Sequence, residues 1–78
     1  MNKIDLTQIN KGEFVQVVEI MGGQHFKEKV DAIGLHVGSR IMKLSTQVLS
    51  GPVTIKIGNT KVALGHGMAK KILVDGKK

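Results

Sequence analysis

The side chains best suited to metal binding or acid–base chemistry are three histidines, His25, His36 and His66, which lie far apart in the sequence. Histidine metal sites usually take ligands a few residues apart on one helix or loop, so this spacing does not indicate a metal site. The six carboxylates form no cluster that would suit a hard cation, and the chain has no cysteine to provide a thiolate ligand. We therefore expect no bound metal and no cofactor.

Two short glycine-rich stretches, residues 22–23 and 65–67, have the composition of phosphate-binding loops but not their spacing. Such loops follow a GxxxxGK[ST] or a GxGxxG pattern, because several backbone amides must converge on one phosphate. We expect these glycines to form turns instead. We also expect a protein that is not an enzyme and has no small-molecule substrate.

The chain is short and basic, with 78 residues and a formal net charge of +6. This length predicts one domain over residues 1–78, with residues 76–78 as a frayed tail. The charge is compatible with nucleic-acid binding, but proteins that bind single strands stack bases on aromatic side chains. The only aromatic residues are two phenylalanines, so a small barrel that binds nucleic acid is the weaker alternative to a solvated basic surface.

The elements that must position any site are organised around a predicted β-hairpin at residues 53–64. Apolar residues alternate with polar ones, which is typical of strands with one buried face. Gly58 and Asn59 tolerate the backbone angles of a two-residue hairpin loop. That loop fixes the register, and the apolar face is predicted to be core: Val53 opposite Leu64, Ile55 opposite Val62, and Ile57 opposite Thr60.

A helix is predicted at residues 24–33, after the glycine break that ends the first strand. Phe26, Val30 and Ile33 fall at helical spacing and form its predicted core stripe. Gly34 follows at the position where a left-handed glycine ends a helix, and Leu35 can make the accompanying apolar contact.

Three further strands are predicted at residues 14–20, 40–48 and 72–74. The first has apolar residues at both parities, which indicates a bend or a bulge. In the second, Met42, Leu44 and Val48 are predicted to form the buried face. The total is about five short strands with one helix after the first strand. We expect a mostly β protein, closed as a small barrel because closure removes exposed strand edges.

Residues 65–71 form the candidate partner-binding surface. We predict one helical turn at residues 68–71, with Ala69 and Ile72 anchoring it to the barrel. The residues predicted to contact a partner combine a flexible methionine with basic side chains: His66, Met68, Lys70 and Lys71. In this interpretation Met68 faces outward; the alternative is an inert connector with Met68 packed into the end of the barrel.

Residues 62–74 (VALGHGMAKKILV) closely resemble the C-terminal signature of the ferrous iron transport protein A (FeoA) family. Matching stretches occur in order at residues 12–13 (GE), 32–41 (AIGLHVGSRI) and 51–53 (GPV). The chain departs from the family pattern at Val37, where proline is common, and at Lys29 and Val30, where arginine and leucine are common.

This resemblance implies an SH3-like β-barrel with a helix inserted after its first strand. It also implies a cytoplasmic accessory protein that binds the FeoB-type ferrous iron transporter, a membrane protein with a GTP-binding domain. We expect recruitment to the inner face of the membrane, with no membrane-spanning segment because no apolar run is long enough. The family's general association with transition metals contrasts with the residues above, which indicate no metal site.

Overall fold

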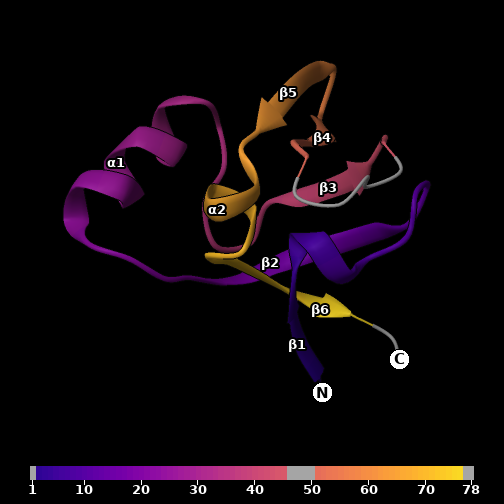
Figure 1. Ribbon diagram of the computed structural model, residues 1–78. Coiled ribbons are helices and arrows are strands. Elements are labelled where there is room, and N and C mark those ends of the chain that lie inside the picture. Colours follow the sequence, from indigo (N-terminus) through magenta and orange to yellow (C-terminus); the bar gives the residue numbers. More distant parts are fainter. Residues whose placement is uncertain (1, 46–50, 77–78) are drawn as a thin grey trace.

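The computed structural model describes residues 2–45 and 51–76 (Figure 1). The elements in these ranges, in chain order, are β1 (Asn2–Asp5), a 3₁₀ helix η1 (Leu6–Gln8), β2 (Phe14–Ile20), α1 (Gln24–Ala32), β3 (Arg40–Lys43), β4 (Val53–Ile57), β5 (Thr60–Leu64), α2 (His66–Ala69) and β6 (Ile72–Gly76). The strands form one antiparallel sheet in the order β1-β6-β2-β3-β4-β5. The mostly β prediction is confirmed, with α1 directly after β2. Strand β1 is an addition that the sequence did not suggest.

The β4–β5 hairpin has the predicted register. Val53 lies opposite Leu64, Ile55 opposite Val62, and Ile57 opposite Thr60. Gly58 adopts a φ of 59°, the left-handed conformation that the two-residue loop requires. Val53, Ile55 and Leu64 are buried, whereas Ile57 and Val62 are partly buried and pack against the core from its margin.

Helix α1 ends in a Schellman motif built on Gly34, whose φ is 89°. The Leu35 N–H donates to the Val30 carbonyl at 2.9 Å, and the Gly34 N–H donates to the Asp31 carbonyl at 2.9 Å. Val30 and Leu35 are both fully buried, so the predicted apolar contact accompanies the motif. Ile33 was predicted to be core and is 38% exposed, because the helix ends before it and the capping residue leaves the helical stripe.

Strand β2 contains the predicted irregularity. Its first half pairs with β3, and its second half pairs with β6, with a shift of register between Val17 and Glu19. The extra residue on one strand bends it, so that the buried side changes along its length. Val15 and Val17 are buried before the shift, whereas Val18 within the shift and Ile20 after it are half-buried.

Strand β3 differs from the prediction in length and in parity. It ends at Lys43 rather than at residue 48, and residues 46–50, which include Val48, lie outside the described residues. Ile41 and Lys43 are buried, whereas Met42 and Leu44, predicted as the buried face, are half-buried. The polar–apolar pattern misled because Lys43 is an inward-facing residue whose long apolar stem fills core space.

The C-terminal strand β6 extends through Gly76, which was predicted to be a frayed tail residue. Gly76 lies opposite Asn2 of β1, and the Ile4 side chain packs directly against it, leaving no room for a Cβ atom. Gly76 is therefore held in the sheet by pairing and close packing. Residues 77 and 78 of the predicted tail lie outside the described residues.

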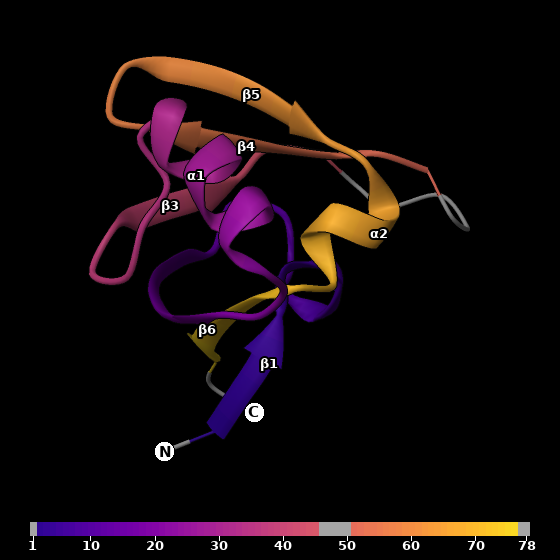
Figure 2. The same cartoon turned by 90° about the vertical axis from the view of Figure 1, so that its left-hand side faces the viewer.

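The core combines aliphatic side chains from distant parts of the chain. Helices α1 and α2 lie on the same side of the β3–β4–β5 part of the sheet (Figures 1 and 2). The buried apolar residues among those described are Leu6, Ile9, Val15, Val17, Val30, Leu35, Ile41, Val53, Ile55, Leu64, Ala69, Ile72 and Val74. Helix α1, α2 and the inward face of the sheet thus share one core.

Candidate partner-binding surface

The short helix α2 begins at His66, two residues earlier than the predicted helical turn at residues 68–71. Its last residue, Ala69, is fully buried, and so is Ile72 at the start of β6. These two side chains anchor the segment to the core, as the sequence predicted. The Lys70 N–H donates to the His66 carbonyl at 3.1 Å and closes the turn. The segment is therefore anchored at its C-terminal end and closed by one helical turn.

The four predicted contact residues are not equally accessible. Lys70 and Lys71 are exposed, whereas His66 and Met68 are half-buried. Met68 packs against the core, which agrees with the alternative of a connector whose methionine lies in the end of the barrel rather than facing outward.

The residues just after α2 are joined to α1 and to the segment before it by contacts that sequence reasoning missed. The Lys71 ammonium lies 5.0 Å from the centre of the Phe26 ring, a cation–π contact. The Met21 N–H donates to the Lys71 carbonyl at 2.7 Å, and the Met21 side chain is 49% exposed. No local pattern connects residues so far apart in sequence. We use the name corner patch for the resulting surface: Met21, Phe26, His66, Met68, Lys70 and Lys71.

The corner patch has the chemistry of a contact surface. Its exposed side chains are Met21, Lys70 and Lys71, and the Phe26 ring among them is half-buried. Methionine adapts its shape to different partners, and a lysine held over a ring is already oriented before a partner arrives. This arrangement fits recognition of a protein surface that has both apolar and acidic groups.

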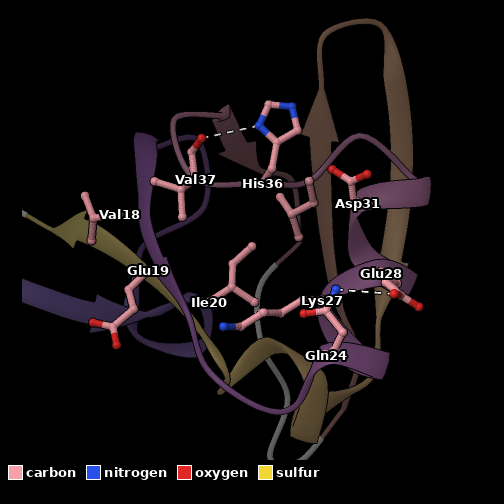
Figure 3. Close-up of a pocket in the computed structure, with 10 residues that line it drawn as sticks. Val18, Glu19, Ile20, Gln24, Lys27, Glu28, Asp31, His36 and Val37 are labelled. Atoms are coloured by element: carbon pink, nitrogen blue, oxygen red, sulfur yellow. Dashed lines mark hydrogen bonds between the residues drawn. The ribbon is translucent and has the colours of Figure 1, made fainter.

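A second feature is a pocket of about 480 Å³ between β2 and α1 (Figure 3). Its apolar walls include Ile20 and Leu35, and Lys27 extends from α1 toward Ile20. On its rim, Glu19 accepts a hydrogen bond from Lys3 at 2.9 Å. This hydrogen bond and the positive charge of Lys3 lower the pKa of Glu19, so that this carboxylate is ionised and paired. The pocket therefore has mixed polarity, and its charged lining residues are mainly acidic: Glu19, Glu28 and Asp31 against Lys27.

His36 at the edge of this pocket is close to Ser39, a pairing that sequence reasoning also missed. The Ser39 Oγ lies 3.3 Å from His36 Nδ1, but it donates to the Gly34 carbonyl at 3.2 Å and accepts from the His36 N–H at 3.0 Å. Ser39 is also buried. These bonds hold the turn that leads into β3, so the serine hydroxyl has a structural role.

Within residues 2–45 and 51–76, no group of three or more His, Asp or Glu side chains is arranged to hold a metal ion. His25 lies on α1, His36 lies in the turn before β3, and His66 begins α2. In the same ranges, no helix is long and apolar enough to cross a membrane.

The antiparallel sheet with α1 inserted between β2 and β3 defines a small SH3-like β-protein. The crystal structure of an Iron Uptake Regulatory Protein (FeoA) superposes with a TM-score of 0.83 at 30% identity, covering 96% of this chain and 97% of that chain. A manganese-dependent transcriptional repressor superposes with a TM-score of 0.83 at 23% identity, covering 92% of this chain and 40% of that one. The second likeness extends to the fold alone.

The sequence comparisons define the family. The FeoA domain matches residues 4–76. The Putative Fe(2+) transport protein A of Methanocaldococcus jannaschii is 32% identical over 65 residues, which are 83% of this chain and 77% of that protein. The chain belongs to the FeoA family, which confirms the resemblance seen in the sequence. Proteins of this family are non-enzymatic accessory proteins.

Proposed function

We propose that this protein is a cytoplasmic accessory of ferrous iron transport, which uses its corner patch to bind the cytoplasmic part of a FeoB-type membrane transporter. The observation that carries the association with iron is the family match over residues 4–76, supported by a relative named as an Fe(2+) transport protein. Iron is then the cargo of the transporter, and this protein contributes a binding surface.

The corner patch is the part of the described surface that best supports a protein contact. It is rigid, because Ala69 and Ile72 anchor it in the core and because the Met21–Lys71 hydrogen bond joins its two halves. A rigid surface loses little conformational freedom on binding, which raises affinity. Its lysines remain accessible at the rim, where charges steer an acidic partner.

The proposal is tested with the double variant Lys70→Glu and Lys71→Glu. Both side chains are exposed, so the fold should be retained, and reversing both charges should weaken transporter binding roughly tenfold or more. Affinity is measured by calorimetry with the isolated cytoplasmic part of the transporter. Met68 is left unchanged, because it packs against the core and its truncation would confound binding with stability.

The matched control is Lys11→Glu with Lys29→Glu, two exposed lysines outside the corner patch. It changes the net charge by the same amount, so it should leave affinity within about threefold of the wild type if the patch, and not overall charge, determines binding. A folded Lys70/Lys71 variant that binds as tightly as the wild type would show that the contact lies elsewhere.

A further inference from the structure

Four side chains form a row across the outer face of the sheet, on the side opposite the core. Phe14 of β2 lies opposite Met42 of β3, Met42 opposite Lys56 of β4, and Lys56 opposite Lys61 of β5. With adjacent strands about 4.8 Å apart, the row is roughly 14 Å long. We call these four residues the outer row.

One end of the outer row is apolar and protrudes into solvent. The Phe14 side chain is 70% exposed, although its strand neighbours Val15 and Val17 are buried in the core. Met42 beside it is half-buried. Because so much of this side chain is exposed, burial in the isolated protein does not explain the presence of a phenylalanine at this position.

The other end of the outer row is cationic, and its lysines form no ion pair within the described residues. Lys56 and Lys61 are directly opposite each other, and side chains at such positions start from Cβ atoms about 4.5–5.5 Å apart. The described part of the chain contains one ion pair, Lys3–Glu19, so neither lysine has a carboxylate partner there. Arg40, which is exposed on the same face, has none either. Two like charges in this position repel unless an anion lies between them.

The outer row faces away from both helices. Ile57 and Val62 of the same hairpin point inward and pack against the core that contains Val30 of α1 and Ala69 of α2. Alternate residues of a strand point to opposite faces, so Lys56 and Lys61 point outward. Figures 1 and 2 show both helices on the inward side of this part of the sheet. The outer row and the corner patch can therefore be occupied at the same time.

We propose that the outer row binds the surface of an anionic lipid bilayer, with Phe14 entering the interface and Lys56, Lys61 and Arg40 contacting lipid phosphates. The charge complementarity is direct, because three cations that have no carboxylate partner among the described residues meet a negatively charged surface. An aromatic side chain beside them adds apolar contact at the depth where aromatic rings are favoured. This inference does not depend on the proposed transporter contact.

A bilayer fits this face better than two other partners. Proteins that bind single-stranded nucleic acid offer several stacking platforms along a groove, whereas the outer row has a single aromatic ring. A tightly bound peptide needs a pocket for its anchor residues. The pocket described above lies between β2 and α1, and no residue of the outer row lines it.

The test mixes the whole chain with lipid vesicles that contain no other protein. One set contains phosphatidylglycerol and phosphatidylethanolamine in equal parts, and the other contains only phosphatidylcholine. Cosedimentation should show binding to the anionic vesicles that falls steeply with salt, and none to the neutral ones. In the variant Lys56→Gln with Lys61→Gln, the partition coefficient should fall roughly 25-fold, about fivefold for each charge removed.

Two further variants separate position from charge. Lys29→Gln with Lys70→Gln also removes two positive charges, but from the helical side of the protein. It should reduce partitioning no more than about threefold at moderate salt, where distant charges are screened. Phe14→Ser keeps the net charge and should reduce partitioning roughly tenfold. Circular dichroism confirms that each variant is folded.

Three results would overturn the inference. The first is wild-type protein that does not bind the anionic vesicles. The second is an equal loss for the two lysine double variants, which would mean that net charge alone controls the interaction. The third is wild-type protein that does not bind vesicles but binds a single-stranded oligonucleotide tightly, when that binding is lost in the Lys56/Lys61 variant. Because the vesicles contain no transporter, none of these results bears on the corner patch.

Discussion

The inward-facing positions of the β4–β5 hairpin and of β3 are filled in different ways. In the hairpin, Val53, Ile55 and Leu64 are aliphatic and buried. In β3, the two inward residues are Ile41 and Lys43, and the lysine is only 2% exposed. Strand geometry alternates side chains between the faces whatever their polarity. A polar residue at an inward position must therefore find a partner inside the protein.

Lys43 has such a partner in the backbone of the N-terminal segment. Its ammonium donates to the Ile9 carbonyl at 2.9 Å, and the Gly12 N–H donates back to the Lys43 carbonyl at 2.7 Å. Burial lowers the pKa of Lys43, and the negative charge of Asp5 opposes that shift. The hairpin is thus held by apolar packing, whereas β3 is tied to the segment after η1 by polar contacts around a lysine.

The largest effect is expected in the hairpin. Ile55→Ala should lower the free energy of unfolding by about 2–5 kcal/mol, because a fully buried side chain leaves a cavity when truncated. The net stability of a domain this small is of the same order, so most of the variant should be unfolded. Urea denaturation measures the loss. The control Thr54→Ala, a half-buried neighbour on the outer face, should cost less than about 1 kcal/mol, and equal losses would contradict the assigned faces.

An intermediate effect is expected for Lys43→Met, which keeps the apolar stem and removes the ammonium. It should cost about 1–2 kcal/mol at neutral pH, because the Ile9 carbonyl loses its hydrogen-bond donor. Because the pKa of Lys43 is lowered from 10.5 in the folded protein, the unfolded chain binds more protons than the folded chain at pH values just below 10.5. The wild-type free energy of unfolding should therefore rise with pH as 10.5 is approached, more than that of Lys43→Met. Parallel pH profiles of the two proteins would show that the ammonium is not desolvated.

This contrast also explains which parts of the fold were predictable from the sequence. The β4–β5 hairpin was predictable because strict alternation and the Gly58-Asn59 loop specify the same register. The end of α1 was predictable because Gly34 and Leu35 stand where a Schellman motif needs them. In both cases local chemistry and tertiary burial agree.

The remaining parts depend on contacts that a local pattern does not contain. Strand β1 is short and pairs only with β6 at the far end of the chain. Lys43 has the polarity of a surface residue, and its burial depends on the Ile9 carbonyl. The corner patch joins Phe26 to Lys71 through the folding of two separate segments. The grouping of residues that we propose as a contact surface therefore depended on the structure, although the sequence had pointed to the loop at residues 65–71.

The smallest effect is expected on the outer face of the β4–β5 hairpin. Its inner face is optimised for packing, whereas its outer face places Lys56 directly opposite Lys61 without a carboxylate partner in the described residues. Like charges at directly opposite positions destabilise a sheet, whereas opposite charges contribute about 0.2–1 kcal/mol. The Lys56–Lys61 repulsion, on the face that we assign to binding, should therefore lower the free energy of unfolding by a small amount that can be measured.

Lys61→Glu should raise the free energy of unfolding by about 0.2–1 kcal/mol, because it replaces a repulsive pair with an attractive one on an exposed strand. Lys61→Gln, which removes the repulsion without adding an attraction, should give a smaller gain. Both gains should shrink in high salt, because exposed charges are screened. The same Lys61→Glu protein should partition less onto anionic vesicles than Lys61→Gln does. If both variants had wild-type stability at low salt, the two lysines would be too far apart to interact. The repulsion between them could then no longer support the proposal that the outer row binds anions.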